Sequence, residues 1–306
     1  MLKLYRERMS MEYAMARLKK PKPPTEALAF GKAFHHQLLT PDAPKPFVVL
    51  PEDAPKRPTP AQLESFKNPK NRLAEETKAA IAWWEKFNEA NKGLDVLEAT
   101  GNYGGRRLEK TAEKFKNHPL AGEILSEGIK TEVSCFAPFN LGGSILRKCR
   151  MDLVPPGVAL VDFKTAMDCS PAGVGKRDEF GYSIFDYDYD MQDAYYLDIW
   201  NDIHRTNRKE TFVNVALDWV DDLELVGIRV MQATADVILC GRDKYTEALA
   251  KWIELTLELL APIFQRHLRP RKRLVHNLLA LVAALDLCYQ ALQQQLGYPR
   301  PIHFPP

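Results

Sequence analysis

A carboxylate and a lysine stand two residues apart at the end of an apolar run, as Asp162 and Lys164. Residues 158–165 are predicted to form a strand, so both side chains point to the same face of a sheet. Charged groups at the end of a buried strand are costly unless they are paired or used. Asp152 lies near the end of the preceding predicted strand. Across the turn at residues 155–157 it could come close enough to share a divalent cation with Asp162.

The two carboxylates of Asp152 and Asp162 would repel each other and raise each other's pKa unless a cation neutralised them. Oxygen ligands of this kind suit Mg²⁺ or Mn²⁺ rather than Zn²⁺. A lysine beside such an ion can orient or deprotonate a water and stabilise charge on a phosphate, which is the equipment for phosphodiester hydrolysis. The Asp-x-Lys spacing by itself is equally typical of a structural ion pair within the strand.

The elements that must position these residues are helices at first and strands afterwards. Helices are expected over residues 26–39, 72–92, 106–127, 190–203 and 242–260, and strands over residues 131–139, 144–154, 158–165, 211–219 and 224–232. The first three strands follow one another closely and predict a β-meander. Residues 41–60 hold seven prolines and are expected to form an extended surface loop. The order predicts one α/β domain, a central mixed β-sheet flanked by helices with an N-terminal helical cap.

Composition narrows the classes of protein without naming one. The 306 residues include 42 basic and 40 acidic side chains, a balance that does not by itself indicate nucleic-acid binding. The five cysteines form no Cys-x-x-Cys pair, which disfavours a zinc ribbon or iron–sulfur cluster and favours free thiols. The charged N-terminus is unlike a signal peptide, and the most apolar stretch, residues 274–287, is too short to span a membrane. We therefore expect a cytoplasmic protein without a membrane partner.

Further motifs surround the Asp152 and Asp162-x-Lys164 core in a fixed order. Upstream stand Gly31-Lys32-Ala33-Phe34-His35, His118-Pro119-Leu120-Ala121 and Glu132-Val133-Ser134, and downstream stands Gln192-Asp193-Ala194-Tyr195-Tyr196. Together they resemble the PD-(D/E)xK nuclease superfamily, and within it the RecE-type and lambda-exonuclease-type phage recombination nucleases of the RecB-like group. The resemblance covers roughly residues 10–260. It departs from the superfamily pattern where Met151, in place of proline, precedes Asp152.

The resemblance implies a restriction-endonuclease-like domain over residues 1–265 and a metal centre within it. The implied ligands are Asp152, Asp162, the backbone carbonyl of Phe163 and, from the upstream helix, His35. The adjacent His36 makes the last assignment ambiguous by one position, and the motif spacing favours His35. Mg²⁺ is the implied cofactor, with Mn²⁺ as a substitute and two ions expected.

Other roles are implied position by position. Lys164 would position or activate the attacking water, and Glu132 would help through a metal-bound water. Gln192 and Tyr196, four residues apart on one helix face, would hold the DNA strand or the lysine. Three basic residues beside the core are expected to meet DNA phosphates: Arg147, Lys148 and Arg150.

The activity implied by the resemblance is a 5′-to-3′ exonuclease on double-stranded DNA ends, which leaves 3′ single-stranded tails for a single-strand annealing recombinase. A ring-shaped homo-oligomer, trimer or tetramer, is implied as well, as are a phage origin and a bacterial host cell. The alternatives are a structure-specific or restriction-like endonuclease on the same fold, and a non-catalytic DNA-binding protein. Residues 266–306, a basic segment and an apolar helix, are expected to make a packing or oligomer contact.

Overall fold

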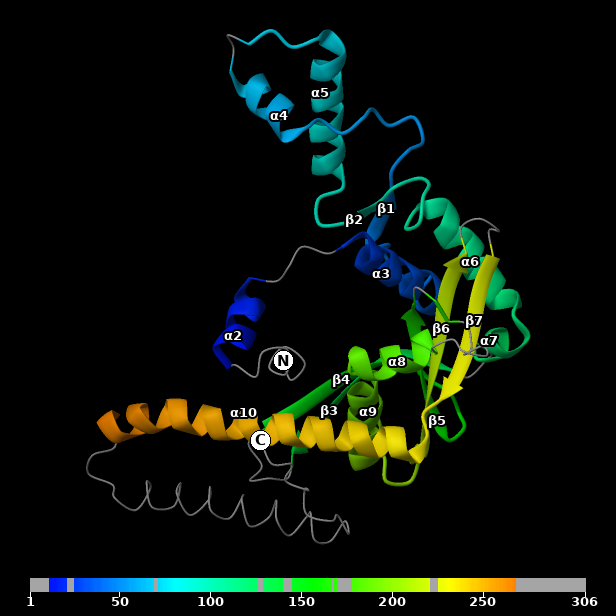
Figure 1. Cartoon of the computed structure of the whole chain (residues 1–306), viewed down its shortest axis with the longest axis vertical. Coiled ribbons are helices and arrows are strands. Elements are labelled where there is room, and N and C mark those ends of the chain that lie inside the picture. The colour runs from blue at the N-terminus through cyan, green and yellow to red at the C-terminus, as the bar shows by residue number, and fades with distance from the viewer. Residues whose placement is uncertain are drawn as a thin grey trace.

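The computed structural model describes residues 11–20, 25–68, 71–125, 129–139, 145–166, 168–169, 178–220 and 225–267. Figure 1 traces these elements along the chain. The expected apolar helix of the tail and Cys288 lie outside the described residues. Within the described ranges, no helix combines the length and the apolarity needed to cross a membrane.

A five-stranded mixed sheet forms the centre of the molecule. Its strands are β3 (Lys130–Phe139), β4 (Ile145–Val154), β5 (Ala159–Thr165), β6 (Thr211–Val220) and β7 (Leu225–Gln232), side by side in that order. β5 and β6 run parallel and the other neighbours run antiparallel. The parallel pair is joined by a crossover that carries α8 (Glu179–Asp186) and α9 (Tyr189–Ile203). The predicted mixed sheet, with its three-stranded meander, is confirmed.

Helices cover both faces of this sheet (Figure 1). On one face, α3 (Glu26–Leu39) and α6 (Gly105–Asn117) share an apolar core with β4, β5 and β6. Its centre is a series of edge-to-face rings, with Phe115 5.0 Å from Phe163 and 6.1 Å from Phe34 between centroids. On the other face, α9 and α10 (Ala235–His267) pack with β3–β6. Both layers therefore bury a large apolar area, which is the main favourable contribution to folding.

The start of α9 is fastened to α10 at a point of close backbone approach. A Cβ on Gly241 would lie 1.9 Å from the carbonyl oxygen of Asp190, so only glycine allows α10 to pass here. One turn later, Lys244 pairs with the fully buried Asp190 at 2.8 Å. This contact fixes the end of α9 that faces the strand carrying Asp162 and Lys164.

The remaining helices and strands lie around this core. They are α2 (Met11–Lys19), β1 (Phe47–Val49), α4 (Pro60–Lys67), α5 (Glu75–Ala90), β2 (Asp95–Leu97) and α7 (Pro119–Glu123). β1 and β2 form a separate two-stranded parallel sheet. The expectation of an unbroken loop over residues 41–60 is therefore wrong at β1, a strand of three residues formed by pairing with β2. In Figure 1, α4 and α5 extend away from the central sheet.

The helix expected over residues 106–127 is divided into α6 and α7. The break falls at His118, whose Nδ1 accepts a hydrogen bond from the Ala121 N–H at 3.1 Å and so caps α7. Pro119 follows in the first helical position, where a missing N–H is tolerated. The His-Pro motif thus has a structural part as the boundary of two helices.

Candidate active site and metal centre

Helix α3 brings His35 against the β3–β4 hairpin. One potential ligand atom from each of His35, Glu132 and Asp152 lies within 4.8 Å of the other two. The Nδ1 of His35 is 3.4 Å from the Oδ2 of Asp152. The neighbouring His36 is buried elsewhere, with its ring edge-to-face on Phe47. Of the two histidines, the one favoured by the motif spacing is the one that faces the carboxylates.

The strand backbone is irregular where these carboxylates lie. Glu132 has a φ of 53°, in the left-handed region, where a glutamate stores about 1–3 kcal/mol of strain. It stands opposite Asp152, between the pairs Thr131–Leu153 and Val133–Met151. Met151 and Leu153 pack into opposite core layers, although residues two apart on a regular strand share a face. The break in alternation turns both carboxylates toward His35.

The Asp152 side chain also accepts a hydrogen bond from the backbone of β5, in a place where a strand partner's carbonyl would normally accept it. These strands pair at Leu153 and Val161, and the Phe163 N–H donates to the Asp152 Oδ2 at 2.9 Å. Burial opposes ionisation of Asp152, but the contact with His35 and the Phe163 amide outweigh it and lower its pKa. For His35, burial is likewise outweighed by Asp152, and its pKa is raised. The Asp152 carboxylate is therefore held in place and charged.

Asp162 and Lys164 face α9 together, as the strand parity predicted. Lys164 Nζ donates to an oxygen of Asp162 and to Gln192 Oε1, the latter at 3.0 Å. Gln192 Nε2 in turn donates to the other oxygen of Asp162 at 2.8 Å. The three side chains form a closed ring of hydrogen bonds. Gln192 is therefore placed to hold both the carboxylate and the ammonium.

The charges of this ring follow from its burial and its partners. Burial and the nearby Asp152 raise the pKa of Asp162 to about 6, against the opposing effect of Lys164. Burial lowers the pKa of Lys164, but attraction to Asp162 outweighs it, so that pKa is raised. Lys164 is accordingly held as an ammonium group that donates hydrogen bonds to Asp162 and Gln192.

Two tyrosines of α9 take different positions. Tyr196 packs in the core layer beneath the sheet, 6.2 Å from the Phe212 ring, and bonds to the backbone of Arg150. It supports β4, and among the described residues no hydrogen bond or cation–ring contact joins it to Lys164. Tyr189 was not among the predicted site residues, yet Lys164 Nζ lies 4.5 Å from its ring centroid. Its position three residues before Gln192, on the same helix face, is the signal that could have found it.

The basic residues of β4 alternate between the two faces of the hairpin. Arg147 is 4% exposed and pairs with Asp202 of α9. Lys148 and Arg150 are exposed on the opposite face, where Arg150 pairs with Glu132. Arg147 thus has a buried structural contact within the protein, Arg150 has an exposed ion pair beside the metal cluster, and Lys148 has an exposed position.

The donor set fits a divalent cation. It consists of the His35 imidazole and the carboxylates of Glu132 and Asp152, with Asp162 and the Phe163 carbonyl on the adjacent strand. Oxygen-rich sets of this kind match Mg²⁺ or Mn²⁺. The strained backbone of Glu132, which brings a second carboxylate beside Asp152, is the feature of this structure that such an ion would explain.

Comparison with known proteins places the chain in a family. No curated protein matches it. A protein from Eubacterium rectale that was provisionally named an exonuclease is similar in structure, with 16% sequence identity and a TM-score of 0.48. The match covers 78% of this chain and 73% of the Eubacterium rectale chain. A phage-related exonuclease from Haemophilus somnus gives 14% identity, a TM-score of 0.29, and coverage of 67% and 92%.

A match to a family model of PDDEXK-like domains confirms the predicted PD-(D/E)xK fold. The narrower RecE-type class stays a prediction. The match runs over residues 1–263, most of the chain and all of the site described above. The chain belongs to the PDDEXK-like domain family of unknown function (DUF3799).

Proposed function

We propose that this protein is a Mg²⁺-dependent exonuclease that digests double-stranded DNA from its ends in the 5′-to-3′ direction and leaves 3′ single-stranded tails. The observation that carries the nuclease assignment is the meeting of two groups at one place. The cluster of His35, Glu132 and Asp152 adjoins the ring of Asp162, Lys164 and Gln192 through the Asp152–Phe163 hydrogen bond. The direction of digestion and the recombination role rest on the resemblance of the sequence motifs.

The cation would be held by His35, Asp152, Asp162 and the Phe163 carbonyl, with Glu132 directly or through a water. Bound there, a divalent ion would polarise the phosphate and lower the pKa of a water; two ions are proposed. Lys164 would donate hydrogen bonds from its ammonium to the attacking water or the phosphate, because its pKa is raised. Gln192 would keep that ammonium aligned.

The outer face of the β3–β4 hairpin offers a path for the DNA toward this centre. Lys148 and Arg150 are exposed there, and Phe136 and Leu146 on the same face are 54% and 65% exposed. Cations can bind the backbone phosphates, and exposed apolar side chains can contact bases at a duplex end. The strand leads directly to Asp152, so DNA lying along it would bring a phosphate to the proposed ion.

Assembly and partners are proposed from the resemblance. A ring of three or four copies would enclose the duplex, and a single-strand annealing recombinase would take up the 3′ tail. We propose that the protein acts in the cytoplasm of a bacterial cell that carries a phage or prophage.

The test is digestion of linear duplex DNA labelled at either end, with Mg²⁺ or with EDTA. We expect mononucleotides released from the 5′ end in Mg²⁺ alone, and loss of digestion in Lys164→Ala and Asp162→Ala. The matched control is Lys148→Ala, which removes a lysine from an adjacent strand and should weaken binding but leave cleavage measurable. Full activity in Lys164→Ala would overturn the nuclease assignment. Equal digestion of closed circular DNA would replace the exonuclease with an endonuclease on the same fold.

A further inference from the structure

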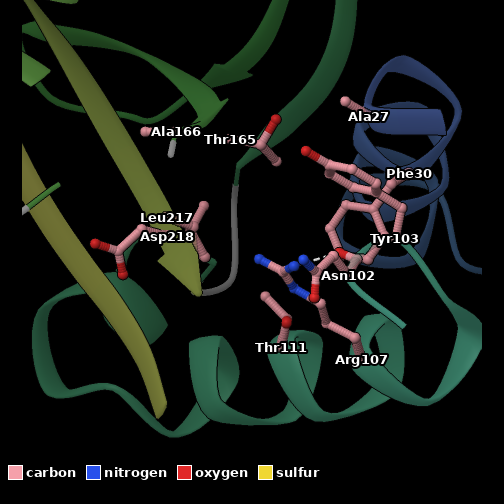
Figure 2. Close-up of a pocket in the computed structure, with 10 residues that line it drawn as sticks. All are labelled: Ala27, Phe30, Asn102, Tyr103, Arg107, Thr111, Thr165, Ala166, Leu217 and Asp218. Atoms are coloured by element: carbon pink, nitrogen blue, oxygen red, sulfur yellow. Dashed lines mark hydrogen bonds between the residues drawn. The ribbon is translucent and has the colours of Figure 1, made fainter. Parts of the chain in front are cut away.

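A separate pocket of about 280 Å³ opens on the α3–α6 side of the sheet, beside the C-terminal parts of β5 and β6. Figure 2 shows its wall, to which α3, α6, the loop before α6 and the two strands contribute. Phe30, on the pocket wall, lies one and a half turns before His35 on α3, and Thr165 follows Lys164 on β5. The pocket is therefore near the metal centre but uses different side chains. Its volume, at the small end for ligand pockets, suits one small molecule rather than a duplex.

On the described wall of the pocket, the positive charge is Arg107 of α6. Its guanidinium carbon lies 5.4 Å from the ring centroid of Phe30 and 5.8 Å from that of Tyr103. Its Nη1 donates to the Asn102 carbonyl, which holds the loop that carries Tyr103. A guanidinium has five N–H donors and can serve several acceptors at once, so Arg107 can hold this loop and also bind an anion.

Thr111 supplies the observation that points to a ligand. It lines the pocket one turn after Arg107 and is 4% exposed. Within the part of the chain that the structure describes, its hydroxyl oxygen is buried without a hydrogen-bond partner. A buried unsatisfied hydroxyl is destabilising, and a ligand that occupied the pocket would supply the missing partner.

The chemistry of the wall selects the ligand. A cation and a hydroxyl match a phosphate, and the ring of Tyr103, 36% exposed, offers a face or edge to a flat base. The one carboxylate on the described wall is that of Asp218, which accepts from the backbone of Cys169 and Gly227 at 2.8 and 2.9 Å. Figure 2 shows it turned away from Arg107, so it leaves the anion position open.

We propose that this pocket binds one nucleotide unit, with its phosphate on Arg107 and Thr111 and its base on Tyr103. The unit is either a free nucleoside monophosphate or one residue of an unpaired DNA strand, since both present the same groups. The proposal does not depend on hydrolysis. A Lys164→Ala variant, in which cleavage should stop, is expected to bind the nucleotide as the unaltered protein does.

The test is calorimetric titration of the full chain with dAMP in EDTA, so that no ion recruits the nucleotide to the metal centre. Arg107→Met should weaken binding about tenfold or more, as expected for a lost charged hydrogen bond. The matched control is Arg106→Met, because the adjacent Arg106 is exposed and pairs with Glu52 at 2.8 Å. That variant should change the affinity by less than about twofold, since a surface ion pair contributes little.

Thr111→Val is a second, independent variant, in case Arg107→Met disturbs the fold of the loop that carries Tyr103. Removing an unsatisfied hydroxyl should leave the melting temperature unchanged or higher, while dAMP binding falls about threefold to tenfold. Competition by an oligodeoxyadenylate identifies the occupant as an unpaired strand, and absence of competition identifies it as the free monophosphate. No saturable dAMP binding, or equal affinity in Arg107→Met or Thr111→Val, would overturn the proposal.

Discussion

Asp193 lies next to Gln192 on α9, has no exposed surface, and accepts a hydrogen bond from Asn214 Nδ2 at 2.8 Å. The second oxygen of Asp193 and the amide oxygen of Asn214 are both buried without a donor among the described residues. A proton on Asp193 would supply that donor and complete an acid–amide pair. Burial, with the nearby charges of Asp162 and Asp190, raises the pKa of Asp193 to about 8.

This pKa predicts how stability changes with pH. Between pH 5 and 7 Asp193 holds its proton in the folded state and loses it in the unfolded state, where its pKa is about 4. The folded state then binds one more proton, so the free energy of unfolding falls by about 1.4 kcal/mol per pH unit, or about 3 kcal/mol over this window. The contribution is fully present below about pH 4 and is lost as pH rises through about 8.

The perturbation is Asp193→Asn, which places a permanent N–H donor where the protonated acid would have its hydroxyl. Urea unfolding at pH 5, 6 and 7 should show a stability difference that shifts in favour of the variant by about 1.4 kcal/mol per pH unit, or about 3 kcal/mol between pH 5 and 7. Subtracting the two curves removes the slopes of His35 and Asp162, whose pKa values are also raised. The exposed Asp186→Asn is the control, expected to follow the unaltered protein. Parallel curves for Asp193→Asn would refute the acid–amide pair.

Three further predictions concern the site. Glu132→Asn should melt no lower than the unaltered protein, because asparagine tolerates a φ of 53° better than glutamate. The same variant should bind Mn²⁺ more weakly in calorimetry. A large fall in its melting temperature would contradict the inference that the Glu132 backbone is strained. Gln192→Ala should reduce cleavage about tenfold to a hundredfold with unchanged DNA affinity, since it leaves Lys164 unaligned, and an unchanged turnover would show that the ring has no catalytic part. Arg150→Ala should lower the salt dependence of DNA binding by about one phosphate contact. Arg147→Ala should instead lower the melting temperature, because it leaves Asp202 without its partner. A change in salt dependence for Arg147→Ala, and in melting temperature for Arg150→Ala, would exchange their roles.

Much of the sheet could be predicted because its strands are marked by local sequence patterns. The run before Asp162 is apolar, turns separate the first three strands, and residue parity alone placed Asp162 and Lys164 on one face. The helices that carry His35 and Gln192 show clear helical periodicity. By contrast, β1 and β2 are three residues each, too short to show a pattern, and they are strands only because they pair with each other.

The details of the hairpin could not be read from residue types. On β4 the arginine at 147 is buried and Leu146 is 65% exposed, the reverse of what hydrophobicity predicts, because Asp202 on α9 provides the arginine with a partner. The left-handed backbone of Glu132 is equally hidden, since a glutamate gives no local sign of it. Both features depend on contacts between segments far apart in the chain.

In the proposed mechanism, Asp152 holds a divalent ion that this protein needs for cleaving DNA. The most direct measurement is Mn²⁺ binding and DNA cleavage in one preparation of the unaltered protein and of Asp152→Asn, which keeps the size of the side chain. We expect saturable Mn²⁺ binding and ion-dependent cleavage in the unaltered protein, and loss of both in the variant with its fold retained. Cleavage in EDTA, or equal cleavage and Mn²⁺ affinity in Asp152→Asn, would contradict this mechanism.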